Sequence, residues 1–355
     1  MPAKDLSDPC MTCKEAESSV FVRKRHLCND CYVQFVSHRV FKRMEKYRLL
    51  RGLPKTSPCK LLLPLSYGLS SSVLLRLLHH QIEDLRSKPH APAGFTLDVI
   101  IIEPSTISPS SPPDNERFEL FQKQFPLCTF TRVPFESIFD FVPDIHEVLS
   151  AYVGSNFTDD SSLSNKERLN AFRSSITTAT SKADVDTTLM NRLIVAFAKK
   201  LDCLGVVWGD SDNRLAAKTL ASAAKGRGAS VTWQVADGMS PWGLEFIFPL
   251  RDLFQWELQS YANLMPELNH LIVADEKPSE TTLTKNLSID ELMMRYVTNQ
   301  GEKYPGIMSN VTRTANKLQS AEDRVGVPRY SATHANGLVP APECLIFDVC
   351  QTMRT

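Results

Sequence analysis

The chain has 355 residues, of which 43% are hydrophobic and 23% are charged, a composition that is ordinary for a globular protein. Its best candidate for a membrane span, Leu61–Leu65, is far shorter than the roughly eighteen apolar residues that a span needs, and residues 1–8 lack the apolar core of a secretory signal. The nine cysteines are an odd number, which argues against a disulfide framework. These features predict a cytoplasmic protein with no role in a membrane.

The charge is distributed unevenly along the chain. Its 40 basic and 40 acidic side chains cancel, but residues 1–60 hold 13 Lys or Arg against 6 Asp or Glu. A basic amino-terminal module on an acidic body favours a polyanionic partner, because Lys and Arg release counterions when they neutralise phosphates. The alternative is a solvated basic surface with no ligand.

Four of the cysteines form two Cys-x2-Cys turns that are fourteen residues apart: Cys10, Cys13, Cys28 and Cys31. Each turn supplies two sulfurs, and two turns complete the tetrahedron of a structural zinc site. A closed four-sulfur site has no open position for a substrate, so its expected role is to hold the neighbouring segments in place. The alternative is that these are reduced cysteines of a disordered leader.

A basic helix is predicted after the second cysteine pair. Apolar residues recur three and four apart from Tyr32 to Tyr47, which is typical of a helix with one side on the core. Most of its cations lie off that stripe. Together with the cations between the cysteine pairs they are the candidate contacts for a polyanion: Arg23, Lys24, Arg25, Arg39, Lys42, Arg43 and Lys46.

From Lys60 the pattern changes to a short strand, a turn of small residues and a helix. A loop between the carboxyl end of a strand and the amino end of a helix presents backbone N–H groups, which suits a phosphate. The small residues of this turn are Ser66, Gly68, Ser70 and Ser71, and a second turn, Gly209-Asp210, follows a later strand. The ordinary alternative for a serine-rich turn is a helix cap.

The later segments alternate between strands and helices. Strands are expected at residues 97–102, 127–133, 204–208, 230–235 and 246–248, and helices at 136–152, 188–201, 214–225, 289–299 and 309–320. This alternation predicts an α/β fold, a mostly parallel Rossmann-like sheet with helices on both faces. Two polar stretches, 104–115 and 155–188, are expected to be mobile insertions. The predicted units are a zinc knuckle with its basic helix at 1–56, the α/β domain at 57–275, and a helical segment with a tail at 276–355.

The residues 60–75 resemble the pyrophosphatase loop of the PP-loop ATPases, whose pattern is Ser-Gly-Gly-x-Asp-Ser after a strand. Ser66, Gly68 and Ser71 match that pattern, while Tyr67 replaces a glycine and Ser70 stands in the place of the aspartate. The resemblance implies that this aspartate helps to hold the magnesium ion of ATP, and a serine hydroxyl lacks the necessary charge. Whether nucleotide still binds this loop is left open.

The second turn resembles the Gly-His-Asn-x-Asp-Asp-x-Ala motif of tRNA-thiolating members of that family. Gly209 and Ala216 remain, but Asp210, Asn213 and Arg214 have replaced the histidine and the paired aspartates. Active members also carry a Cys-x-x-Cys unit between the two motifs for an iron–sulfur cluster or persulfide chemistry. Because the cysteines in this interval, Cys128 and Cys203, are far apart, no iron–sulfur cluster is expected in this chain.

The order of these motifs over residues 10–320 resembles the second subunit of the cytoplasmic tRNA 2-thiolation proteins. The resemblance implies a heterodimer with a catalytic PP-loop subunit, which puts sulfur on the wobble uridine of tRNAs for lysine, glutamine and glutamate. It implies a thiocarboxylated ubiquitin-related modifier as the sulfur source and a further candidate partner. In that complex this chain would be non-catalytic and would hold the anticodon arm through the seven cations named above.

Two other interpretations stay open. The chain is an independently active adenylating enzyme if Asp210 and Asp212 replace the lost carboxylates. It is a protein-interaction scaffold with a zinc knuckle if the basic helix binds acidic proteins instead of RNA. Members of the resembled family usually end in a further cysteine-rich knuckle, but Cys344 and Cys350 have no second pair, and the sequence does not decide whether they bind metal.

Overall fold

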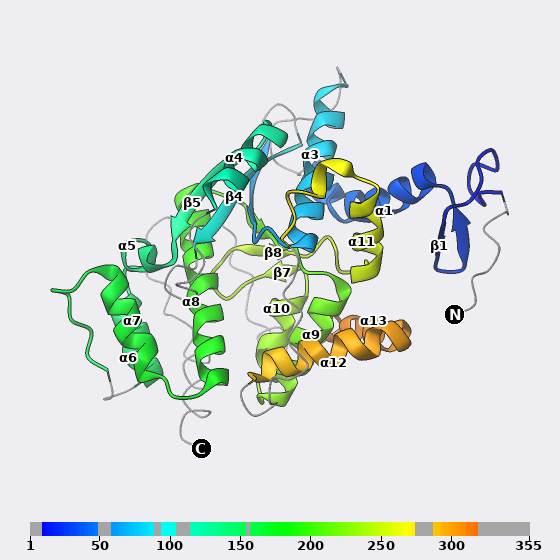
Figure 1. Ribbon diagram of the computed structural model, residues 1–355. Helices are drawn as coiled ribbons and strands as arrows, with labels where there is room; N and C mark the ends of the chain where they lie inside the picture. The colour runs from blue at the N-terminus through cyan, green and yellow to red at the C-terminus, as the bar shows by residue number, and fades with distance from the viewer. Residues whose placement is uncertain are drawn as a thin grey trace, which may run out of the picture.

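A computed structural model describes residues 9–48, 58–88, 94–103, 114–153, 157–273 and 287–318. A small amino-terminal hairpin leads through a long helix to an α/β body, and two further helices follow the body (Figure 1). In chain order the elements are β1 (Val20–Val22), β2 (Arg25–Leu27), α1 (Asn29–Arg43), α2 (Glu45–Arg48), β3 (Cys59–Pro64), α3 (Leu69–Arg86), β4 (Phe95–Glu103), α4 (Asn115–Gln124), β5 (Thr129–Pro134), η1 (Phe135–Ser137), α5 (Ile138–Phe141), α6 (Ile145–Val153), α7 (Asn165–Ser175), α8 (Ala179–Lys200), β6 (Gly205–Val207), α9 (Asp212–Ala224), η3 (Gly228–Ser230), α10 (Val231–Val235), β7 (Gly238–Met239), β8 (Glu245–Ile247), α11 (Gln255–Asn263), η4 (Pro266–Leu268), α12 (Ile289–Lys303) and α13 (Pro305–Ala315).

The main sheet of the described residues has six strands in the order β5-β4-β3-β6-β8-β7. All neighbouring strands are parallel except β7, which pairs antiparallel with β8. This arrangement confirms the α/β fold predicted from the sequence. The parallel direction gathers the carboxyl ends of β3, β4 and β6 at one edge of the sheet, which is where such folds bind ligands.

Helices cover both faces of the sheet (Figure 1). Leu61 and Leu63 of β3 pack on one face with residues of α1, α3 and α11, whereas Leu62 points to the other face with residues of α8. Because successive strand residues point to opposite faces, a strand buried on both sides appears in the sequence as a continuous apolar run. None of the described helices is both long and apolar enough to cross a bilayer.

One local prediction was wrong. Residues 231–235, expected to continue a strand from Ser230, form the short helix α10, because a brief apolar run suits a buried helix as well as a strand. The stretch 155–188 was expected to be a mobile insertion, and its described residues include α7 and the beginning of α8. A capping box begins α7, and Leu169 and Phe172 are fully buried, so a few apolar residues anchor a mostly polar helix.

The other expected insertion, 104–115, falls largely outside the described residues, which resume at Asp114. Beyond the body, α12 and α13 pack on α9 through a small cluster that includes Ala216, Val297 and Met308. Both carboxyl-terminal helices were predicted from the sequence. Cys344 and Cys350 lie outside the described residues.

Candidate functional site

The four predicted metal ligands lie together. Their sulfur atoms are all within 4.8 Å of one another, and the Cys13 and Cys28 sulfurs are 3.8 Å apart. Bonds of about 2.3 Å to one tetrahedral ion place two thiolate sulfurs about 3.8 Å apart, so the arrangement fits a single four-coordinate metal ion. Among the described residues this is the one group of at least three His, Cys, Asp or Glu side chains with such a geometry.

The electrostatics of this cluster also favour a cation. Burial, reinforced by the neighbouring thiols, raises the pKa of Cys31 to about 12. Burial acts in the same direction on Cys10, but hydrogen bonds from the backbone at Cys13, Cys28 and Thr12 outweigh it and lower the pKa of Cys10 to about 6. Four neighbouring thiolates repel one another, and a bound metal cation removes that penalty.

The cysteine pairs flank a strained hairpin that is docked on the body. Its turn residues Arg23 and Lys24 have φ angles of 46° and 67°, in the left-handed region that tight hairpin turns require. The Arg23 guanidinium donates two hydrogen bonds to the fully buried carboxylate of Glu257, at 2.7 and 2.8 Å, and a third to the Asp252 carbonyl. The Tyr32 hydroxyl donates to the Glu257 carbonyl at 2.7 Å. The hairpin and α1 are therefore anchored to α11.

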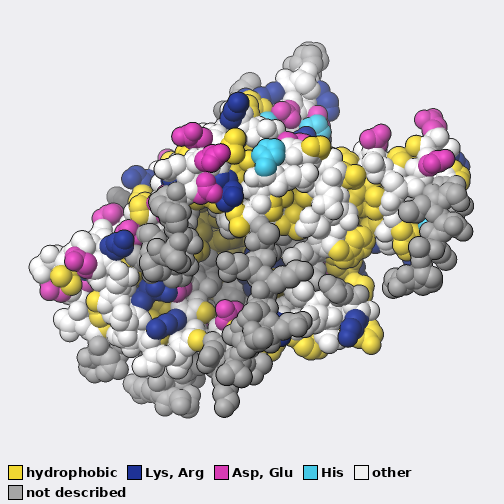
Figure 2. Space-filling view, in the orientation of Figure 1, with side chains coloured by type: hydrophobic (Ala, Val, Ile, Leu, Met, Phe, Trp, Pro, Cys, Tyr) yellow, Lys and Arg dark blue, Asp and Glu magenta, His cyan; other side chains and the backbone are white. Residues whose placement is uncertain are grey.

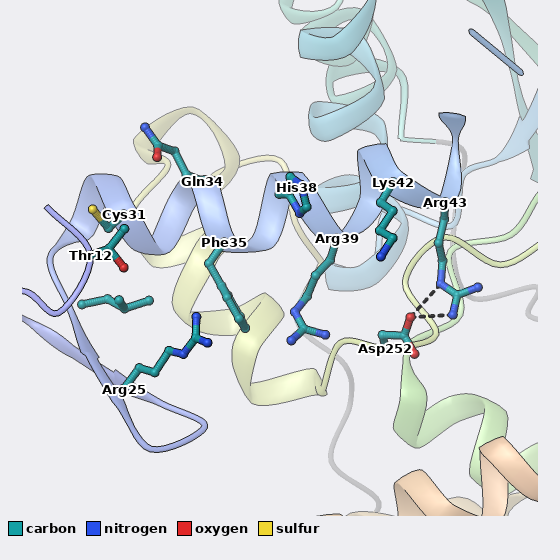
Figure 3. A pocket seen from close by; sticks show the side chains of 11 residues that line it. Thr12, Arg25, Cys31, Gln34, Phe35, His38, Arg39, Lys42, Arg43 and Asp252 are labelled. Carbon is teal, nitrogen blue, oxygen red and sulfur yellow. Dashed lines mark hydrogen bonds and ion pairs between the residues drawn. The ribbon is translucent and has the colours of Figure 1, made fainter. Parts of the chain in front are cut away.

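This docking creates a groove of about 840 Å³ between the hairpin and α1. Arg25 reaches into it from the hairpin, and Phe35, Arg39 and Lys42 reach into it from α1 (Figure 3). The Arg39 guanidinium lies 4.5 Å from the centre of the Phe35 ring. The complete lining is Thr12, Arg25, Leu27, Cys31, Gln34, Phe35, His38, Arg39, Lys42, Arg43 and Asp252.

The groove carries excess positive charge. Its acidic residue, Asp252, accepts hydrogen bonds from Arg43, at 2.8 Å to Nε, so those two charges cancel. Within the described part of the chain, Arg25, Arg39 and Lys42 form no ion pair. Partial burial and, to a smaller extent, the positive charge of Arg23 lower the pKa of Arg39. A bound anion would raise that pKa again, because it stabilises the charged guanidinium. On the face drawn in Figure 2, Lys and Arg side chains are scattered.

The seven cations predicted to bind a polyanion thus fall into two groups. Arg25, Arg39 and Lys42 line the groove, and Lys24 is exposed at the hairpin turn. The other three form ion pairs with the body of the protein: Arg23 with Glu257, Arg43 with Asp237 and Asp252, and Lys46 with Glu245. These three hold the module in place, and their charge is largely neutralised.

The nucleotide-loop residues of the two motifs also meet. Ser66, Gly68, Ser70, Ser71, Gly209 and Asp210 all line one cavity of about 1110 Å³ at the carboxyl edge of the sheet. Tyr67, in the place of a glycine, has a φ of 60°, the left-handed conformation that glycine adopts without strain. Gly209 lies so close to the other motif that an added Cβ would be 2.8 Å from the Ser71 Cα.

The carboxylates that line this cavity are mostly paired with cations. The ion pairs are Asp210 with Lys218 at 2.6 Å, Glu103 with Arg132 at 3.2 Å, Asp114 with Arg117 at 2.7 Å and Asp186 with Arg173 at 2.8 Å. Asp212 does not line the cavity and lies against α13, where the Ser309 hydroxyl donates to it at 3.4 Å. The two aspartates that could replace the lost catalytic carboxylates therefore point in different directions.

Cys128 and Cys203 lie at the opposite edge of the sheet, since each precedes a parallel strand, β5 or β6, and the cavity lies where strands end. Burial raises the pKa of both thiols to about 12, which disfavours the reactive thiolate. These two cysteines and the loop cavity do not form one site.

Several site residues were not predicted as such. Phe35 appears in the sequence as one more apolar residue of the helix, although it stacks with Arg39 in the groove. Glu257 and Asp252 lie more than two hundred residues from the arginines that they bind, at separations of 234 and 209 residues. No local pattern could have revealed those pairs.

The fold and the site define a PP-loop-like α/β protein that carries a four-cysteine module and a basic groove. Over its length the structure is similar to a U34-tRNA thiolase from Methanococcus maripaludis with its [4Fe-4S] cluster, with a TM-score of 0.58, 14% identity, and coverage of 98% of this chain and 97% of that one. At that identity the likeness shows the fold alone.

The chain belongs to the cytoplasmic tRNA 2-thiolation protein 2 family. It is 64% identical to the member from Aspergillus niger over 326 residues, 92% of this chain and 89% of that protein. It is 68% identical to the member from Aspergillus oryzae over 322 residues, 91% of this chain and 89% of that protein. A family model with the same description matches residues 288–349. The resemblance found in the sequence is confirmed, and the relatives' name agrees with the predicted cytoplasmic location.

Proposed function

We propose that this chain is the tRNA-binding, non-catalytic subunit of a tRNA 2-thiolation complex. The observation that carries the proposal is the groove between the hairpin and α1. Arg25, Arg39 and Lys42 line it without forming an ion pair with any described residue, and the Phe35 ring lies beside Arg39. Cations of this kind bind RNA phosphates without reading bases, and an aromatic ring beside them can stack on an unpaired base. Of the seven cations predicted from the sequence, the proposed RNA contacts are therefore those that do not form ion pairs with the body of the protein.

The proposed lack of catalysis rests on the loop cavity. A PP-loop enzyme needs carboxylates that hold the magnesium of ATP, whereas Asp210 forms an ion pair with Lys218 and lies 3.8 Å from the Arg214 guanidinium. Ser70 supplies no charge at the other motif. A magnesium ion would have to displace Lys218 from Asp210 and bind beside the Arg214 guanidinium.

In this proposal a separate catalytic PP-loop subunit completes a heterodimer. That partner activates the wobble uridine of tRNAs for lysine, glutamine and glutamate with ATP, and a thiocarboxylated ubiquitin-related modifier supplies the sulfur. Family membership supports these roles. The part of this chain is to hold the anticodon arm in the groove and to stabilise the partner.

We further propose that the four cysteines hold zinc. A [4Fe-4S] cluster binds its cysteines through four different irons, which spreads the sulfurs farther apart than one ion does. The separation of 3.8 Å between the Cys13 and Cys28 sulfurs matches a single ion. Elemental analysis of the purified protein should find about one zinc and no iron per chain, and stoichiometric iron with sulfide would contradict this assignment.

The tRNA role is tested by reversing the charge of two exposed groove residues in the double variant Arg25→Glu, Lys42→Glu. Each lost phosphate contact reduces the slope of log affinity against log salt concentration by about 0.9, so this slope should fall by about 2 in the double variant. The variant should also bind tRNA about 10- to 100-fold more weakly near 0.1 M salt. The measurement is a fluorescence anisotropy titration with tRNA at several salt concentrations.

A matched control is the double variant Lys199→Glu, Lys200→Glu, which makes the same change of charge at the end of α8 on the other face of the sheet. It should bind tRNA like the unmodified protein. Equal affinity and equal salt slope for the groove variant and the unmodified protein would refute the proposal. Loss of binding in both double variants would show that only net charge matters.

A further inference from the structure

A second cavity, separate from the basic groove, lies over β6 and β8 between α8, α9, α10 and α12. Its volume is about 380 Å³, within the range of about 300–1,000 Å³ that is usual for small-molecule sites. Three of the four tryptophans of the chain line it: Trp208, Trp233 and Trp242. We call it the tryptophan cavity.

The aromatic rings form one connected cluster. The Trp233 and Trp242 rings pack edge to face with centroids 5.0 Å apart, and Trp208 packs edge to face on Phe246 at 5.3 Å. All three indoles are only partly buried, although large aromatic side chains usually bury most of their surface in a core. An edge-to-face contact covers one face of only one of the two rings, and the partly exposed faces that remain can bind planar groups by stacking. The Lys218 ammonium lies over the Trp208 ring, 5.8 Å from its centroid.

The indole N–H of Trp208 is a second sign of a missing ligand. This nitrogen is shielded from solvent and has no hydrogen-bond partner among the described residues. A buried donor without an acceptor is destabilising, and a ligand could supply the acceptor by offering a carbonyl oxygen or a ring nitrogen.

The charges around the cavity are arranged asymmetrically. At one end Lys225 forms ion pairs with Asp184 at 2.7 Å and Asp290 at 2.8 Å, and Arg227 pairs with Asp184 at 2.9 Å, so these two cations and two carboxylates cancel. At the other end, where the tryptophan cavity meets the loop cavity, the Arg214 side chain is 51% exposed and lies 3.8 Å from its nearest carboxylate. That guanidinium can still bind an anion.

We infer that the tryptophan cavity binds a nucleotide, with its base against the indole rings of Trp208, Trp233 and Trp242 and its phosphate toward Arg214. The indole faces fit a planar ring, the unpartnered N–H of Trp208 fits an acceptor on that ring, and the half-exposed Arg214 guanidinium fits an anionic group. A nucleotide combines these three features. The nucleotide is either free in solution or one unit of an RNA strand. This inference goes beyond the proposed function, because it uses no residue of the basic groove.

The test uses the tryptophans themselves as reporters. Trp256, the remaining tryptophan, lies on α11 and is 42% exposed, so Trp256→Phe leaves emission from the cavity alone. Uridine monophosphate, adenosine monophosphate and a short single-stranded oligouridylate are titrated separately into this variant. Saturable quenching is expected, together with shifts of the cavity indole N–H signals in nuclear magnetic resonance spectra of the protein with its tryptophans labelled.

Two substitutions in that background test the geometry. Trp233→Leu removes a stacking face and should weaken binding about 5- to 150-fold, since stacking on one ring contributes about 1–3 kcal/mol. Trp208→Phe keeps a ring but removes the N–H donor, and should weaken binding about 2- to 10-fold. Circular dichroism checks that each variant is folded, and the indole N–H shifts test the inference in the intact cavity if a variant does not fold.

The outcomes separate the two sources of the nucleotide. Saturation by a mononucleotide supports a free ligand, whereas saturation by the oligouridylate alone supports a unit of RNA. No quenching and no indole shift with any of the three compounds at millimolar concentration would overturn the inference, as would unchanged affinity in Trp233→Leu. The groove variant Arg25→Glu, Lys42→Glu should leave mononucleotide binding unchanged, so this inference and the proposed tRNA role fail independently.

Discussion

The ion pair between Arg23 and Glu257 should determine whether the cysteine module stays docked on the body. The Glu257 side chain is fully buried and accepts hydrogen bonds from Arg23 and from the Phe254 amide, the latter at 2.9 Å. Replacing Arg23 by methionine leaves a buried carboxylate whose remaining donor, among the described residues, is the Phe254 amide. That unpaired charge, rather than the lost contact itself, should dominate the cost.

Breaking a fully buried ion pair costs about 3–5 kcal/mol, but the Arg23 side chain is 26% exposed, so water replaces part of the interaction. We therefore expect Arg23→Met to lower the free energy of unfolding by about 2–3 kcal/mol. Glu257→Gln keeps an acceptor for the Phe254 amide and should cost about 1–2 kcal/mol. The double variant should be at least as stable as Arg23→Met alone, because the glutamine removes the unpaired charge.

The assay is urea unfolding followed by circular dichroism for the four proteins of this double-mutant cycle. Hydrogen exchange at the backbone of β1 and β2 reports in parallel whether the hairpin has left the body. Lys24→Met is the control, since Lys24 is the neighbouring cation and is exposed, and it should change stability by less than about 0.5 kcal/mol. Additive costs for the two substitutions, with no coupling between them, would refute this account of the docking.

Three further outcomes are expected. Lys24→Gly should stabilise the protein by about 0.5–1 kcal/mol in thermal unfolding, because glycine adopts a φ of 67° without strain, and a loss of stability would contradict the turn geometry. Gly209→Ala should cost about 1–3 kcal/mol, because its Cβ would meet the Ser71 backbone at 2.8 Å, whereas unchanged stability would show that the two loops are not in contact. Burial raises the pKa of Asp212 to about 6, so the folded state binds this proton more tightly and stability should fall as the pH rises from about 4 to 6. Asp212→Asn should flatten that dependence, and an equally steep pH profile in the variant would assign it to other groups.

The local features of the site could be predicted from the sequence. The four cysteines could be singled out as candidate metal ligands because two Cys-x2-Cys turns are a short-range pattern, and the structure brings their sulfurs together. The strand before Ser66 and the strand before Gly209 were identified from short apolar runs, and parallel pairing then requires their carboxyl ends to share an edge. The helix after Cys31 was predicted from its periodicity in the same way.

Features that depend on distant residues were decided only by the tertiary structure. Seven cations looked alike in the sequence, but folding places buried or half-buried carboxylates beside Arg23, Arg43 and Lys46 and leaves Arg25, Arg39 and Lys42 to line a groove. Similarly, the three tryptophans of the tryptophan cavity come from separate segments that only the packing of α9 and α10 on the sheet unites. The physical reason is that spacing along the chain fixes local geometry, whereas the charge and exposure of a side chain depend on whatever the fold brings next to it.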